Sequence, residues 1–215
     1  MYTPSSFAEQ RGDVLFPFLE AHPFGALITS SALGIRATHL PFLVDRTRGD
    51  AGTIYAHMAR ANREHAGVSN GDEAMLMVTG PDAYISPSWY PSKQEHGKVV
   101  PTWDYVAVHV YGSLRFVDDA AWLRAHVGAL TARREGAREH PWAVGDAPDA
   151  FIAQQLKAIV GVELSIARME GKWKMSQNRS AADVASVAAN LARSADARER
   201  AVGELVEEHA PERVE

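Results

Sequence analysis

Apolar and polar residues alternate with a period of two over much of the chain, which is typical of strands with one buried face. This pattern predicts strands at residues 23–30, 35–45, 53–58, 73–80 and 105–117, and a last strand with its turn at 160–176. Short turns such as "TRGDAG" separate the early strands, so neighbouring strands are expected to form hairpins and an antiparallel sheet. Six strands with frequent glycine and proline favour a small closed or split barrel.

Helical periodicity appears in fewer places and lies mostly late in the chain. The pattern predicts helices at 13–21, 118–135 and 148–159, a short helix within 59–72, and an alanine-rich helical tail from residue 180. In the segment at 118–135, Trp122, Leu123, Val127 and Leu130 recur at helical spacing. The fold class is therefore predicted as mainly β with helices (α+β), with a barrel domain at 1–179 and a C-terminal helical tail at 180–215.

Composition excludes several classes of protein. The 215 residues are 46% hydrophobic and 23% charged, an ordinary globular mixture. No cysteine is present, which excludes disulfides, thiolate nucleophiles and iron–sulfur clusters. A net charge of −5 does not favour nucleic acid as a general partner. Neither a signal peptide nor a long apolar run is visible, so a cytoplasmic protein with no membrane contact is expected.

The common catalytic motifs are also missing. The nine histidines include no HxH or HExxH pair, so no metal site is predicted. The chain has no GxSxG elbow, no dinucleotide-binding glycine pattern and no P-loop.

One group of polar residues can nevertheless form an anion site. Arg60 and Asn62 follow the strand at 53–58, and the preceding strand carries Arg36, Thr38 and His39. Guanidinium and amide donors on neighbouring strands suit a phosphate monoester. A second group, "EGKWKMSQNR" at 170–179, combines lysines with a tryptophan.

The segment "YISPSWYPSKQEHGKVVPTWDY", residues 84–105, is rich in proline, aromatic and basic residues. Trp89 and Trp103 can stack on a flat ligand and Lys98 can donate to one. A cofactor wall and a seal between subunits are both open interpretations of this loop.

Together these motifs resemble the FMN-binding negative transcriptional regulator family, of the protease and sporulation-inhibition regulator type, within the pyridoxamine-phosphate-oxidase-like FMN-binding split barrels. The resemblance rests on "MYTPSSF", "AHPFGALITS", "ATHLPFLVD", "HMARAN", the 84–105 loop, "LTARREG" and "GKWKMSQNR". It departs at Asp104 and Met175, where the family usually has asparagine and leucine.

The resemblance implies a six-stranded antiparallel split β-barrel with peripheral helices, and a homodimer with FMN at its interface. By motif position, it implies that one subunit contributes Arg36, Thr38, His39, Leu40, His57, Met58, Ala59, Arg60 and Asn62. The other subunit is implied to contribute Lys172, Trp173, Lys174, Ser176 and Gln177, and Trp89, Lys98 and Trp103 are candidate ring contacts.

Three functions stay open on the sequence. The first is an FMN-binding repressor of transcription with DNA as a partner. The stretch "LTARREGAREH" is locally basic and "QNRSAADVASVAANLARSADARER" can present arginines, but no helix-turn-helix is evident. The second is a flavin-dependent oxidoreductase or a haem-binding or haem-processing enzyme of the same barrel class, with haem as the alternative cofactor. The third is a non-catalytic flavin or metabolite sensor.

Overall fold

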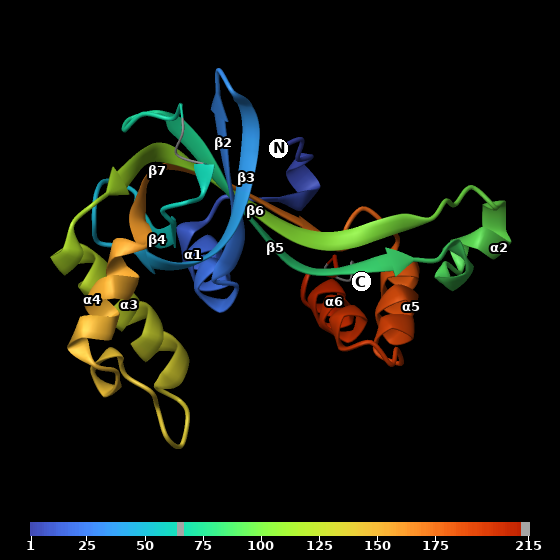
Figure 1. Ribbon diagram of the computed structural model, residues 1–215. Helices are drawn as coiled ribbons and strands as arrows, with labels where there is room; N and C mark the ends of the chain where they lie inside the picture. The colour runs from blue at the N-terminus through green and yellow to red at the C-terminus, as the bar shows by residue number, and fades with distance from the viewer. Residues whose placement is uncertain (64–66, 212–215) are drawn as a thin grey trace. The chain divides into compact units, whose positions relative to one another are not determined.

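The computed structural model describes residues 1–63 and 67–211 (Figure 1). Its strands are β1 (Ala8–Glu9), β2 (Phe24–Ser31), β3 (Gly34–Asp45), β4 (Thr53–Ala59), β5 (Glu73–Ile85), β6 (Thr102–Val117) and β7 (Ile159–Lys174). They form one sheet in the order β1-β7-β4-β3-β2-β5-β6, and β7 also pairs with β6. Because β6, at the far end of this order, also pairs with β7, the six strands from β2 to β7 close into a barrel.

In the part of the chain that the structure describes, the sheet has seven strands, one more than the six predicted from the sequence. The additional strand, β1, has two residues and pairs antiparallel with β7, where Ala8 lies opposite Lys172. Two residues are too few to show a period, so the sequence pattern could not reveal this strand. The pairings of β2 with β3, β3 with β4, β2 with β5, and β4 with β7 are all antiparallel, as expected from the hairpins.

The helices lie largely where helical spacing was found. They are α1 (Gly12–Ala21), α2 (Ser92–His96), α3 (Ala120–Glu135), α4 (Asp149–Lys157), α5 (Ala181–Leu191) and α6 (Ala197–Glu208), with short 3₁₀ turns η1 (Ser5–Phe7), η3 (Pro87–Trp89) and η4 (Val144–Asp146). The short helix expected within 59–72 falls partly on residues 64–66, outside the described residues. Residues 60–62 and 67–72 form turns and irregular backbone.

Contacts between Cα atoms divide the chain into two compact units. Unit 1 comprises 1–15, 79–108 and 170–215, and unit 2 comprises 16–78 and 109–169. The boundary predicted at residue 179 stays a prediction. Over the described residues, no helix combines the length and apolar character needed to cross a bilayer.

In unit 2, helices α3 and α4 lie side by side (Figure 1) and bury Leu123, Ile152 and Leu156 between them. A Cβ atom at Gly161 of β7 would lie 2.3 Å from the ring of Trp122. Glycine at this position therefore lets the indole of α3 lie directly on the strand.

In unit 1, α5 and α6 form a helical pair (Figure 1) with Val184, Leu191, Val202 and Val206 fully buried. The side chain of Ser180 accepts a hydrogen bond from the amide of Asp183 and caps the start of α5. The tail predicted as helical is thus a packed hairpin of two helices over its described residues.

Candidate cofactor-binding site

A group of polar side chains in unit 2 gathers between β3 and the turn that follows β4. Arg36 and Thr38 lie two residues apart on β3, so their side chains share one side of the strand. The amide of Asn62 donates a 2.8 Å hydrogen bond to the Thr38 hydroxyl, and the Arg36 guanidinium donates to the backbone carbonyl of Arg63. A guanidinium, an amide and a hydroxyl are therefore brought together, a set of donors that suits a phosphate.

The other two predicted residues of β3 point into different surroundings. Leu40 is 3% exposed and belongs to the core of unit 2. His39 is exposed and stacks on Phe24 of β2, with ring centroids 6.2 Å apart. Phe24 and Ile35 are themselves 59% and 78% exposed. The outer face of the β2–β3 hairpin is thus apolar and open in the single chain.

The predicted site residues of β4 have side chains in three different environments. Met58 is buried in the core, whereas Ala59 is exposed. His57 turns toward α3, where its Nδ1 lies 3.1 Å from Nε2 of His126. Burial lowers the pKa of His57, and burial together with the charge of His57 lowers the pKa of His126 to about 4. This histidine pair is therefore held neutral near pH 7.

Arg60 bonds to residues just before α3 and at the end of α4. Its guanidinium forms two hydrogen bonds to the carboxylate of Asp118, at 2.6 and 2.9 Å. It also donates to the backbone carbonyls of Lys157 and Ile159. The structure thus separates Arg60 from the group of Arg36, Thr38 and Asn62, because its donors are directed at other partners.

Glu163 of β7 is a buried centre of hydrogen bonds that the sequence analysis missed. It is 4% exposed and accepts from Arg115 at 2.6 and 2.9 Å and from the indole of Trp122 at 2.9 Å. Trp122 in turn stacks on His126, with centroids 5.2 Å apart and the rings 19° from parallel. A glutamate between the apolar residues Val162 and Leu164 of a predicted strand was the signal that could have revealed this centre.

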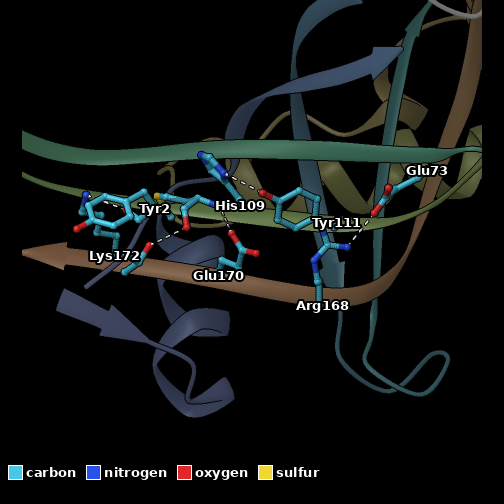
Figure 2. Close-up of polar contacts among 9 residues, drawn as sticks. Tyr2, Glu73, His109, Tyr111, Arg168, Glu170 and Lys172 are labelled. Carbon is cyan, nitrogen blue, oxygen red and sulfur yellow. Dashed lines mark hydrogen bonds and ion pairs between the residues drawn. The ribbon is translucent and has the colours of Figure 1, made fainter. Parts of the chain in front are cut away.

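The basic residues of β7 are held within unit 1. Lys172 is 8% exposed, donates to the carbonyl of Tyr2 at 3.2 Å, and lies over the Tyr105 ring at 5.2 Å. Figure 2 shows Lys172 beside Tyr2. The figure also shows a separate contact of unit 2, in which Arg168 reaches Glu73 and stacks 3.7 Å over the ring of Tyr111. Trp173 is 6% exposed and is part of the packed interior of unit 1.

Asp104 organises the turn after β7. It is fully buried, lies 3.1 Å from the Lys174 ammonium, and accepts a 2.6 Å hydrogen bond from the Ser176 hydroxyl. Ser176 has a φ of 58°, the left-handed region. Gln177 accepts from the amide of Met175 and donates to the carbonyl of Trp173. The hydrogen bonds of Lys174, Ser176 and Gln177 therefore stabilise this turn within unit 1.

The 84–105 loop is anchored to α5 rather than left open. The amide and hydroxyl of Ser92 donate to the carboxylate of Asp183, at 3.1 and 2.8 Å, and the Ser186 hydroxyl donates to the carbonyl of Trp89. Lys98 is exposed. Trp103 is 55% exposed and meets Tyr84 edge-on, with centroids 6.0 Å apart. Trp103 and Tyr84 therefore remain available for stacking.

The comparison with known proteins decides the family. The profile of the family described as "Putative FMN-binding domain" matches residues 1–168. The chain belongs to this family. The match confirms FMN as the predicted cofactor, and the antiparallel barrel confirms the predicted fold class.

Relatives of this FMN-binding family span nearly the whole chain. The protease synthase and sporulation protein PAI 2 of Bacillus subtilis is 28% identical over 208 residues, which cover 97% of each chain. An uncharacterized protein of Aspergillus fumigatus is 30% identical over 228 residues, covering 85% of this chain and 87% of its own.

Two solved structures share the fold of the FMN-binding chain. The FAD and heme binding protein of Mycobacterium smegmatis aligns with a TM-score of 0.57 at 16% identity, covering 83% of this chain and 79% of its own. The flavocytochrome Anf3 of Azotobacter vinelandii aligns with a TM-score of 0.55 at 16% identity, covering 78% and 69%. At such identities, the likeness extends to the fold alone.

Proposed function

We propose that the chain acts as a homodimer that binds FMN, with the phosphate at Arg36, Thr38 and Asn62. The observation that carries this proposal is the hydrogen bond between Asn62 and Thr38, which joins donors from β3 and from the turn after β4 beside the Arg36 guanidinium. A phosphate dianion can accept from all three groups at once. When bound, FMN supplies a redox-active ring, while these residues only hold and orient it.

The test is a titration of the apo protein with FMN, followed by flavin fluorescence quenching. Replacing Arg36 by Ala should weaken binding about 10- to 100-fold, because a hydrogen bond to a charged group contributes about 1.5–3 kcal/mol. Thr38→Val, which keeps the shape but removes the hydroxyl, should weaken it about tenfold. The matched control is Arg134→Ala, since Arg134 is an exposed arginine in the last turn of α3. Equal losses in Arg36→Ala and Arg134→Ala would contradict the proposal.

We also propose that the outer face of the β2–β3 hairpin forms the subunit interface. Phe24, Leu33 and Ile35 are 59%, 61% and 78% exposed in the single chain. Exposed apolar side chains gathered on one hairpin are typical of a surface covered by a partner. Ile35→Asp should convert a dimer to a monomer in light-scattering chromatography, whereas Val100→Asp, on another exposed apolar residue, should not. A wild-type monomer at micromolar concentration would refute this.

For the biological role, we propose a flavin-dependent negative regulator in preference to an enzyme. The proposal is supported by the likeness to PAI 2 over 97% of both chains and by the family resemblance of the motifs. A regulator of this type should retard specific promoter fragments at physiological salt, since nonspecific binding is lost there. Steady oxidation of NAD(P)H by the flavin-loaded protein would instead support the oxidoreductase alternative, and a Soret band on purification would support haem binding.

A further inference from the structure

Unit 2 contains a cavity of about 590 Å³ between α3, α4 and the turn that follows β4. Its walls are mostly apolar, formed by small alanines and by Leu123 and Leu156. Ala153 of α4 also faces it, and because its side chain is short, space remains above the buried leucines. This volume lies in the range of small-molecule sites, which are generally apolar with a few polar groups at the edge.

Cationic groups dominate the polar edge of the cavity. Arg60, Arg124 and Lys157 line it, with Asp118 as the one acidic group. The charge of Asp118 is met by Arg60, at 2.6 Å. Arg124 pairs with Asp149 at 2.7 Å. The Lys157 ammonium has no hydrogen bond or ion pair with any residue of 1–63 or 67–211, and thus remains available to a ligand.

A lysine at the end of a helix also has an ordinary explanation, since cations there meet the helix dipole. Here, however, the Arg60 guanidinium donates to the carbonyl of Lys157, the last residue of α4, and the Arg60 backbone amide donates to the carbonyl of Ala158 at 2.8 Å. The dipole is therefore already compensated by one cation. Lys157 adds a further positive charge next to an apolar cavity, which is the arrangement that an amphipathic anion requires.

We propose that this cavity binds a small organic anion that carries one carboxylate on an apolar body, with the carboxylate on Lys157 and the body against Leu123 and Leu156. One unpaired cation matches one negative charge. None of Arg36, Thr38 and Asn62 lines the cavity, so the site is separate from the proposed phosphate position of FMN and does not depend on it.

The test is calorimetric titration of the full chain with decanoate, repeated with saturating FMN present. Decanoate should bind one molecule per chain with or without FMN, and decanol should bind more weakly because it lacks the charge. Lys157→Gln should weaken decanoate binding about fivefold, the effect of a partly exposed ion pair. Ala153→Leu should weaken it at least about tenfold by filling the space.

Two control variants match these changes in chemistry and place. Arg134→Gln removes a positive charge from the end of α3, outside the cavity, and Gln154→Leu adds a leucine to α4 next to Ala153 but outside the lining. Both should bind decanoate like the wild type. The proposal is overturned if decanol binds as tightly as decanoate, if Lys157→Gln and Arg134→Gln behave alike, or if FMN displaces decanoate competitively.

Discussion

The carboxyl of Asp104 provides a sharp test of how charge is balanced inside unit 1. Asp104 is fully buried. It shares the Lys174 ammonium with two other acceptors, the Thr102 hydroxyl and the carbonyl of Trp103. Burial raises the pKa of Asp104 above its ordinary value of 3.8, and the hydrogen bond from Ser176 and the charge of Lys174 oppose this effect. The ionised carboxylate is therefore costly in the folded state.

The sign of this pKa shift fixes the direction of the effect on stability. A folded-state pKa above the unfolded value means that the carboxyl stabilises the fold when protonated, below about pH 4. That contribution is lost as the pH rises through the folded-state pKa. Asparagine is neutral at every pH and can still accept from Lys174 and pair with the Ser176 hydroxyl. Asp104→Asn should thus raise the free energy of unfolding at pH 7 by about 1 kcal/mol.

Asp104→Ala should act in the opposite direction. It leaves the Ser176 hydroxyl and one donor of Lys174 without an acceptor, which costs about 3 kcal/mol. For a chain of this size, about 1 kcal/mol corresponds to about 2–4 °C in Tm. Thermal unfolding followed by circular dichroism should then show Asp104→Asn about 2–4 °C above the wild type and Asp104→Ala about 6–12 °C below it. The gain of Asp104→Asn should shrink as the pH approaches 4. If Asp104→Asn and Asp104→Ala are destabilised equally, the ion pair outweighs burial and the reasoning is wrong.

Four further substitutions test other contacts. Gly161→Ala should lower stability by about 1–3 kcal/mol in urea unfolding, because the new Cβ would meet the Trp122 ring. Gly128→Ala on α3, where nothing lies within 4 Å, should instead stabilise by about 0.5–1 kcal/mol. Asp183→Ala removes two of the hydrogen bonds that anchor the 84–105 loop to α5, so trypsin should cleave this loop faster than in the wild type. His126 has a folded-state pKa of about 4, below its ordinary 6.5, so stability should fall as the pH drops from 6.5 to 4, with a shallower slope in His126→Gln.

The strands could be predicted because a strand with one buried face alternates apolar and polar residues. The residues at which the strands begin and end could not be predicted. The strand predicted at 73–80 continues to Ile85 through Pro81, a residue that usually ends a strand. The strand predicted from 105 begins at Thr102. Within the 84–105 loop, the short helices η3 and α2 were not foreseen, since a few residues show no helical period.

The sequence predicted those contacts of the candidate site that arise from the pairing of two consecutive strands. Thr38 and Asn62 meet because β3 and β4 pair, and that pairing was expected from the turn between them. Arg60 was placed in the same group but bonds to Asp118, Lys157 and Ile159, which come from much later in the chain. Such long-range partners leave no periodic trace in the sequence, so local pattern could not identify them.

The interleaving of the two units also affects how the chain is made. Unit 1 takes its segments from 1–15, 79–108 and 170–215, and Ala8 of β1 pairs with Lys172. During synthesis from the N-terminus, β1 therefore stays without its partner until β7 has left the ribosome. Unit 2, complete at residue 169, can condense first, and unit 1 can close only after the segment that begins at residue 170 has been made. Folding on the ribosome is thus expected to pass through a stage in which residues 1–15 are exposed, a natural target for chaperones.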